Sequence, residues 1–287
     1  MPDFPIVSRL EIINIETGVR QEVYSRTCLF EAPNWSRDGK FLVFNQDGLL
    51  HKIPVAGGQP EALFSGNANK NNNDHGISPG GDEIAISHHS ENDNGDSIIY
   101  IMPIGGGEPR RITTLGPSYW HGWSPDNKRL VYVAGRKHSR HYNIYSVDVD
   151  GGNETQLTFT DGLDDGPDYS PCGKYIYYNS YRAEKMQIWR MLENGKEQTQ
   201  LLHSPHSDWF PHPSPDGKYL VFLRYLNDMG QDHPFGQEVK LMLLHIESHK
   251  LRDLTGVFYG GQGTINVPSW SPDSTEFAFV SYEKMTD

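Results

Sequence analysis

A short turn motif recurs six times in this chain of 287 residues and limits how the chain can fold. The motif reads aromatic or apolar residue, Ser, Pro, Asp, Gly, with one or more positions varied in several copies. Its serines are Ser36, Ser78, Ser124, Ser170, Ser214 and Ser271, so successive copies lie 42, 46, 46, 44 and 57 residues apart. Repeats of this length indicate a fold assembled from equivalent supersecondary units.

Each repeat predicts four short β-strands. An apolar segment with β-branched and aromatic residues follows every turn, as in residues 130–133. A third segment, such as 144–147, ends at a glycine-rich hairpin that favours positive φ, and a fourth ends at Leu157-Thr158. Four strands in roughly 45 residues are typical of a propeller blade. Residues 1–287 are therefore predicted to form one all-β domain, a six-bladed β-propeller of four-stranded antiparallel blades.

The two ends of the chain predict how the ring of blades closes. After Tyr282 the last repeat contains only its first two strands, whereas residues 10–24 read as the third and fourth strands of a blade. We therefore expect the N-terminal strands to complete the blade that begins at Val267. This closure would pair strands that otherwise leave open edges.

The turns, the Ile-Tyr third strands and the Gly-Gly-x-x-x-x-Leu-Thr blade ends resemble the repeats of TolB-like β-propellers over residues 9–282. That family includes periplasmic TolB, propeller domains of serine peptidases, and oligogalacturonate lyases. A serine peptidase is not expected, because no Gly-x-Ser-x-Gly elbow is identified and no residues remain for a hydrolase domain. The resemblance implies the fold, and the fold alone does not choose among these functions.

Charge and composition exclude several classes of function. The 25 basic and 37 acidic residues give a net charge of −12, which repels nucleic acids and anionic membrane surfaces. No run of 18 apolar residues occurs, so membrane insertion is not expected. The chain begins without a signal-peptide pattern, which favours the cytoplasm; a chain whose signal peptide had been removed would look the same and would be periplasmic.

Strand connectivity predicts which end of the propeller carries the function. The turns between first and second strands, and the hairpins between third and fourth strands, point to one end, here called the turn face. The remaining connections point to the opposite end, the loop face, which receives the long polar and aromatic segments. These segments are 69–75, 88–97, 119–121, 135–143, 161–165, 207–210, 224–238 and 259–266.

Histidines on the loop face suggest a metal or proton-transfer site. His75 and His121 both lie three residues before the repeat serine, where the other four repeats have proline, so we expect equivalent positions at the channel mouth. His212 lies one residue later in its own repeat. These imidazoles could hold a divalent metal ion in the central channel or transfer protons, or each could simply bond a neighbouring loop.

Carboxylates, arginine and aromatic residues supply further candidates. Carboxylates could bind a ligand or act as acid and base, and arginine could clamp a carboxylate. Aromatic rings could stack on sugars or pack between blades. The ligand-binding candidates are Trp120, Asp164, Asp165, Asp208, Trp209, Tyr259, Gln262 and Asn266, and the catalytic candidates are His121 and Arg224.

Two hypotheses of function follow. The first is a non-catalytic binding module that presents the loop face to a small polar ligand, a glycan or a protein. The alternative is a carbohydrate-active enzyme, a lyase or hydrolase of acidic oligosaccharides, with a metal and histidine site at the channel mouth. A complete scaffold without a complete catalytic motif favours the first hypothesis.

Overall fold

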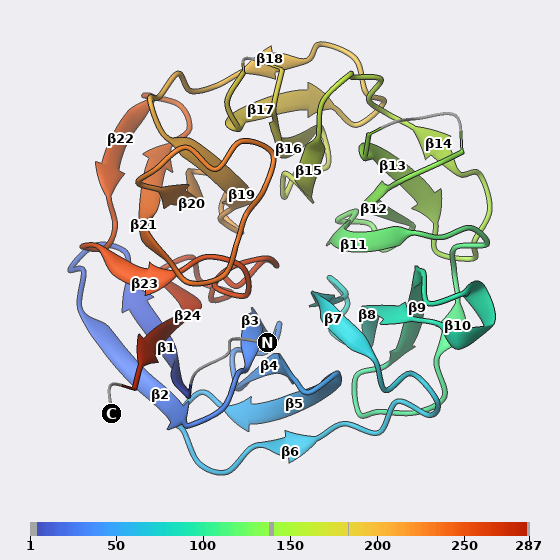
Figure 1. Cartoon of the computed structure of the whole chain (residues 1–287), viewed down its shortest axis with the longest axis horizontal. Helices are drawn as coiled ribbons and strands as arrows, with labels where there is room; N and C mark the ends of the chain where they lie inside the picture. The colour runs from blue at the N-terminus through green and yellow to red at the C-terminus, as the bar shows by residue number, and fades with distance from the viewer. Residues whose placement is uncertain (1–4, 138–140, 183, 286–287) are drawn as a thin grey trace.

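Six antiparallel sheets surround a central axis like the blades of a propeller (Figure 1). The structure is a computed structural model that describes residues 5–137, 141–182 and 184–285. Residues 138–140 of the loop-face segment 135–143 therefore lie outside the described residues. The all-β, six-bladed fold predicted from the repeats is confirmed.

Five blades follow one another along the chain, each with its strands in sequential order. Blade 1 contains β3 (Glu31–Trp35), β4 (Phe41–Gln46), β5 (Leu49–Pro54) and β6 (Glu61–Ala62). Blade 2 contains β7 (Asn71–Ile77), β8 (Glu83–His89), β9 (Ser97–Pro103) and β10 (Arg110–Arg111). Blade 3 contains β11 (Ser118–Trp123), β12 (Arg129–Ala134), β13 (Asn143–Asp148) and β14 (Thr155–Gln156).

Blade 4 contains β15 (Asp164–Tyr169), β16 (Tyr175–Ser180), β17 (Gln187–Leu192) and β18 (Thr199–Gln200). Blade 5 contains β19 (Ser207–Pro213), β20 (Tyr219–Tyr225), β21 (Gln237–His245) and β22 (Lys250–Asp253), and the short β23 (Phe258–Gly260) also pairs with β21. A 3-10 helix, η1 (Glu91–Asp93), lies between β8 and β9. Within the described residues, no helix is long and apolar enough to cross a membrane.

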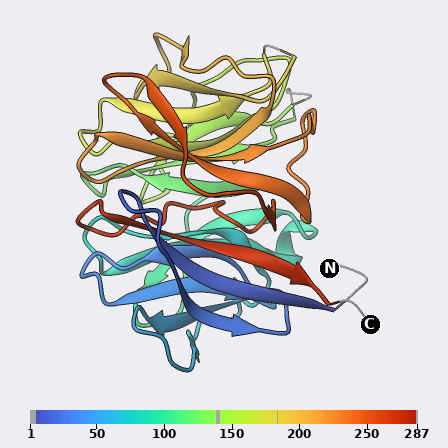
Figure 2. The same cartoon turned by 90° about the vertical axis from the view of Figure 1, so that its left-hand side faces the viewer.

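Blade 6 joins the two ends of the chain, as predicted. Strand β1 (Ile6–Asn14) pairs antiparallel with β24 (Glu276–Lys284) over nine residue pairs, and β2 (Arg20–Arg26) continues the sheet. The two strands run side by side in Figure 2. An isolated bridge between Trp270 and Phe277 adds the innermost segment of this blade.

The recurring serine, aspartate and glycine stabilise the repeat turn. The Ser36 hydroxyl donates a hydrogen bond to the Asp38 carboxylate (2.8 Å) and accepts hydrogen bonds from the backbone N–H groups of Lys40 and Phe41. Gly39 has a φ of +75°, a conformation that side chains disfavour. The same serine-to-aspartate bond forms in the turns at Ser124, Ser214 and Ser271. The residues that make the repeat visible therefore hold the turn face together.

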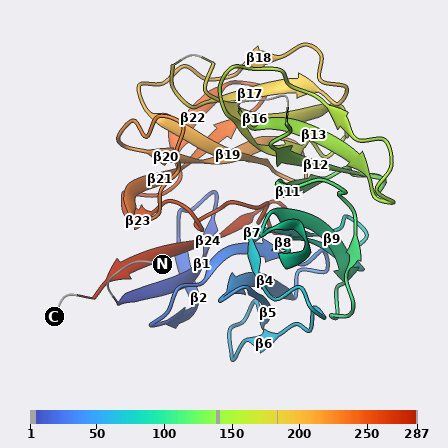
Figure 3. The ribbon, with the colours of Figure 1, turned by 45° about the vertical axis from the view of Figure 1, so that its right-hand side comes forward.

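The first strands of the blades position the channel. In Figure 1, β3, β7, β11, β15 and β19 lie nearest the axis, and β7 and β11 lie side by side there and in Figure 3. The core lies between neighbouring sheets, where Ile99 and Ile101 of blade 2 pack against the Trp120 and Tyr132 side chains of blade 3. Because the sheets are fixed by this packing, the ends of the first strands form rigid walls at both ends of the channel.

Candidate functional site

A cavity of about 440 Å³ lies on the loop face and is here called the mouth cavity. First strands and long loops from several blades contribute to it. Its lining residues are Asn72, Asn73, Asp74, His89, Tyr119, His121, Val133, Tyr142, Leu163, Asp165, Phe210, Gln231, His233, Gln262 and Asn266. The cavity lies on the predicted face, and its volume is within the usual range for small-molecule sites.

Asp165 lies between two histidines in the mouth cavity. Its Oδ1 is 3.2 Å from Nε2 of His121, and its Oδ2 is 3.5 Å from Nε2 of His233. The backbone N–H of Gly166 also donates a hydrogen bond to Oδ1 at 2.7 Å. The three side chains, here called the His–Asp–His cluster, come from β11, β15 and the loop between β20 and β21. One carboxylate thus orients two imidazole rings.

Burial and charge set the protonation of this cluster. Burial opposes ionisation of Asp165, but the hydrogen bond and charge of His121 outweigh it and hold the pKa of Asp165 below its usual value. Burial likewise opposes protonation of His121, but Asp165 and the nearby Asp74 outweigh it and raise the pKa of His121. Burial raises the pKa of Asp74 to about 7. The cavity therefore holds groups that can exchange protons near neutral pH.

Four buried polar atoms of the mouth cavity have no hydrogen-bond partner in the described residues. They are Nδ2 of Asn73, Nδ1 of His121, Nδ1 of His233 and Oε1 of Gln262. Unpaired buried polar atoms are uncommon in folded proteins, because each costs the lost hydration of a donor or acceptor. Water or another polar molecule in the cavity could supply the missing partners, so this group of atoms makes the mouth cavity the strongest candidate binding site.

Aromatic rings form another part of the cavity wall. The rings of Tyr119 and Tyr142 have centroids 6.0 Å apart, and His89 lies edge-on to Tyr119 at 6.5 Å. Phe210 stacks on the imidazole of His121 at 6.2 Å. An aromatic wall opposite unpaired donors and acceptors suits a ligand with both an apolar face and hydroxyl groups.

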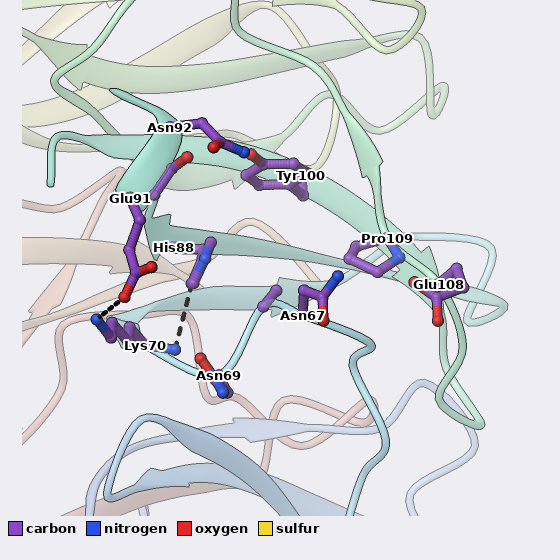
Figure 4. A pocket seen from close by; sticks show the side chains of 11 residues that line it. Asn67, Asn69, Lys70, His88, Glu91, Asn92, Tyr100, Glu108 and Pro109 are labelled. Atoms are coloured by element: carbon purple, nitrogen blue, oxygen red, sulfur yellow. Dashed lines mark hydrogen bonds and ion pairs between the residues drawn. The ribbon is translucent and has the colours of Figure 1, made fainter. Parts of the chain in front are cut away.

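A second hollow, shown in Figure 4, has a volume of about 500 Å³ but lacks these features. It lies along blade 2, where the Lys70 ammonium pairs with Glu91 at 2.6 Å and the Lys70 backbone N–H donates to Nδ1 of His88. None of the unpaired buried polar atoms belongs to its lining residues. It therefore lacks the unpaired buried groups of the mouth cavity, which is the stronger candidate site.

Four of the candidate residues from the sequence meet in the mouth cavity. His121, Asp165, Gln262 and Asn266 all line it, and Asn266 uses its Oδ1 to accept a hydrogen bond from the backbone of Gly263. Asp74 and His233 lie in segments that were predicted for the loop face, but neither residue was among the candidates. Asp74 directly precedes His75, and His233 is the histidine of the long 224–238 loop, which are the signals that could have identified them.

His75 differs from the expectation that it matches His121. His121 lies in a β-bulge, because Trp120 pairs with Tyr132 and Gly122 with the next residue, Val131. His75 instead pairs directly with Ile86. One extra residue reverses the side on which a strand side chain points, so equal sequence offsets place the two histidines differently. His75 is fully buried outside the mouth cavity, and burial lowers its pKa to about 4.

The proposed metal set does not come together. His212 is held by the Asp168 carboxylate at 3.2 Å and by the backbone carbonyl of Ile265 at 2.7 Å. In the described part of the chain, no three His, Cys, Asp or Glu side chains are grouped so that they could hold a metal ion. His75, His121 and His212 therefore occupy three separate environments.

Other charged candidates are engaged with protein groups. Arg224 donates two hydrogen bonds to Asp208, from Nε at 2.7 Å and from Nη2 at 2.8 Å. The Asp164 carboxylate accepts a hydrogen bond from the Thr160 hydroxyl and lies 3.5 Å from Nη2 of Arg182. These side chains form contacts within the protein and do not line the mouth cavity.

The aromatic candidates pack within the protein. Trp120 lies against the Cα of Gly76 and faces the turn-face end of the channel. Trp209 is fully buried and contacts His233 edge-on at 4.7 Å, so it supports the His–Asp–His cluster from behind. Tyr259 contacts Phe235 edge-on at 6.0 Å. Tyr119 and Tyr142, rather than these three residues, present rings to the mouth cavity.

The string Gly76-Ile77-Ser78-Pro79-Gly80 matches Gly-x-Ser-x-Gly but is an ordinary repeat turn. It joins β7 to β8, and the Ser78 hydroxyl donates to Asp82 and accepts the backbone N–H of Glu83. A nucleophile elbow instead joins a strand to a helix and exposes its serine. Ser78 is buried and bonded, so this turn lacks the exposed serine of a nucleophile elbow.

Comparisons with known proteins identify the family. Residues 122–260 match the model of the TolB β-propeller domain. An uncharacterized protein from Agrobacterium fabrum is 48% identical over 276 residues, covering 96% of this chain and 92% of that protein. The structure of a protein provisionally named TolB from Agrobacterium tumefaciens is 46% identical, with a TM-score of 0.92, and covers 98% of this chain and 99% of the other.

A more distant likeness concerns the fold alone. The oligogalacturonate lyase of Vibrio parahaemolyticus is 14% identical, with a TM-score of 0.56 and 98% of both chains covered. On the closer relatives, and on the six blades and their repeat turns, this chain belongs to the TolB-like β-propeller family.

Proposed function

We propose that this protein is a non-catalytic binding module that holds a small, neutral polyhydroxyl ligand, such as one sugar unit, in the mouth cavity. The observation that carries the proposal is the group of four unpaired buried polar atoms around that cavity. An amide N–H donor, an amide carbonyl acceptor and two imidazole nitrogens together match a ligand whose hydroxyl groups both donate and accept.

The charge of the cavity supports a neutral ligand. His121 and Asp165 shift each other's pKa towards the ionised forms, whose opposite charges offset each other, and Asp74, with a pKa of about 7, is partly protonated at neutral pH. The wall formed by Tyr119 and Tyr142 offers aromatic surface to the CH groups of a sugar ring. The terminal sugar of a glycan would fit the same chemistry, because only one sugar unit needs to enter the cavity.

The test is titration of the protein with neutral monosaccharides, followed by isothermal calorimetry and saturation-transfer NMR. We expect one or more sugars to bind, and we expect Gln262→Ala to weaken binding about fivefold, the usual effect of removing one neutral hydrogen bond. Asn92→Ala in the hollow of Figure 4 is the matched control and should bind like the wild type. Absence of sugar binding, or equal binding by Gln262→Ala, would refute the proposal.

One observation favours a carbohydrate-active enzyme as the second candidate. His121 is oriented by Asp165, its Nδ1 has no partner, and both His121 and Asp74 have pKa values shifted upward. Such groups can act as general acid and base. If the wild type cleaves an acidic oligosaccharide, and His121→Ala abolishes cleavage while binding persists, this enzymatic function replaces the binding function.

A further inference from the structure

The turn-face end of the channel contains a separate cavity of about 240 Å³, here called the turn-face cavity. It shares no lining residue with the mouth cavity. Aromatic and proline residues form most of its wall, including Trp35, Trp120, Trp123, Trp270 and prolines that follow the repeat serines. This apolar wall surrounds a few polar groups, which is the usual composition of a ligand pocket, on a scale suited to a small molecule.

Arg37 departs from the repeat motif, and it lies at this cavity. It occupies the position after the repeat serine, where the other five copies have proline. Its guanidinium lines the cavity and donates hydrogen bonds to the backbone carbonyls of Ser78 and Ile77, both at 3.2 Å. Carbonyl groups fix the guanidinium without neutralising it. The one carboxylate whose charge acts on Arg37 among the described residues is Asp168, which is itself engaged with His212. A positive charge is therefore placed in an apolar cavity.

The other ionisable lining group, Asp168, does not cancel this charge. Nε2 of His212 lies 2.7 Å from the carbonyl oxygen of Ile265, which only accepts, so Nε2 carries a proton. Nδ1 of His212 lies 3.2 Å from Oδ2 of Asp168, and this contact needs a second proton on one of the two groups. Wherever that proton resides, the pair has no net charge. Arg37 therefore supplies the net positive charge of the group formed by Arg37, Asp168 and His212.

Two buried indole groups of the same cavity have no acceptor. Nε1 of Trp35 and Nε1 of Trp120 have no hydrogen-bond partner in the described residues, and these side chains are 4% and 1% exposed. Two other tryptophans of the wall are satisfied, since Trp123 donates to the carbonyl of Gly76 and Trp270 to that of His212. An indole nitrogen can only donate, so both unpaired groups require an acceptor atom.

We propose that the turn-face cavity binds the carboxylate of a small apolar acid. The guanidinium of Arg37 and the unpaired indole N–H groups supply the positive charge and donors for the carboxylate oxygens, and the aromatic and proline wall receives the apolar body. The same chemistry is offered by a free aromatic acid and by the C-terminal carboxylate of a peptide ending in an apolar residue. The test distinguishes these two sources.

Calorimetric titration with phenylacetate tests the free acid, and titration with an N-acetylated tripeptide ending in Phe tests the peptide. Phenylacetamide and the N-acetylated, C-terminally amidated tripeptide are the uncharged controls and should bind at least about tenfold more weakly. The informative variant is Arg37→Pro, because it restores the residue of the other five repeats and suits the turn. We expect it to weaken carboxylate binding about tenfold or more.

Further variants keep the test decisive. Arg37→Gln removes the charge if Arg37→Pro does not fold, and Trp35→Phe removes one indole donor with a several-fold loss expected. Binding of the peptide acid but not of phenylacetate identifies the peptide as the source. Failure of both acids to bind at about 10 mM, or binding that Arg37→Pro and Arg37→Gln leave unchanged, would overturn the proposal. Because the two cavities share no residue, sugar binding at the mouth cavity is an independent result.

Discussion

The side chain of Asp74 connects the mouth cavity to the stability of the fold. It is 7% exposed, lies close to the Asp165 carboxylate, and has a pKa raised to about 7, chiefly by burial. In the unfolded chain the same group ionises near its ordinary value of 3.8. Folding therefore favours the protonated carboxyl, and the stability that this provides is lost as the pH rises from about 4 through about 7.

We predict that Asp74→Asn stabilises the protein at pH 8. Asparagine keeps a polar side chain without a charge, so the cost of ionising a buried carboxyl disappears. A difference of about three pKa units corresponds to on the order of 4 kcal/mol at most. Urea unfolding at pH 8 and pH 4 measures the effect, and the variant should exceed the wild type at pH 8 only. A variant that is less stable than the wild type at pH 8 would show that the ionised carboxylate is favourable.

Part of the site was predictable from the sequence at the residue scale, and the rest depended on backbone details. His121 and Asp165 were identified because the repeats place their segments on the loop face. His75 was misplaced because the bulge at His121 changes the register by one residue, which residue counting does not reveal. His233 was missed because a long loop folds back over the channel, and its destination depends on tertiary contacts.

At the scale of elements, the closing strand β1 carries more stability than an edge strand would. Leu10 is fully buried and packs with Phe30, Phe44 and Val280, so it joins blade 6 to blade 1. We expect Leu10→Ala to reduce the free energy of unfolding by about 3 kcal/mol, since it removes a large buried side chain and leaves a cavity. Chemical denaturation followed by circular dichroism provides the measurement.

Val19→Ala is the matched control for Leu10→Ala. Val19 belongs to the turn between β1 and β2 and is 66% exposed. Its truncation should change the free energy of unfolding by no more than about 0.5 kcal/mol. Equal effects of the two substitutions would mean that the closing strand is not anchored by Leu10.

The β-strands could be predicted because the residues that form the hydrogen bonds of each repeat turn are the same residues that recur in the sequence. Serine, aspartate and glycine recur where the hydroxyl of Ser36 binds the next backbone N–H groups and Gly39 adopts a positive φ. The alternating segments after each turn then specify the second and third strands. The short β23 could not be predicted, because three residues that pair with β21 inside a long connection leave no periodic pattern in the sequence.

At the scale of the whole molecule, the pairing of β1 with β24 makes the ring of blades continuous. An open array of repeats can lose its terminal units separately, because each unit contacts only its neighbours. In a closed ring every blade has two neighbours, and opening any blade exposes apolar surface on both of them. We therefore propose that residues 1–287 unfold as one cooperative domain.

The tryptophans allow this proposal to be tested, since they are distributed over five blades. They are Trp35 in blade 1, Trp120 and Trp123 in blade 3, Trp189 in blade 4, Trp209 in blade 5 and Trp270 in blade 6. We expect tryptophan fluorescence and far-ultraviolet circular dichroism to give the same denaturation midpoint, and the calorimetric and van't Hoff enthalpies to agree. Leu10→Ala should move both midpoints equally. Separate midpoints, in the wild type or in this variant, would mean that the blades unfold independently and that the closing strands do not couple them.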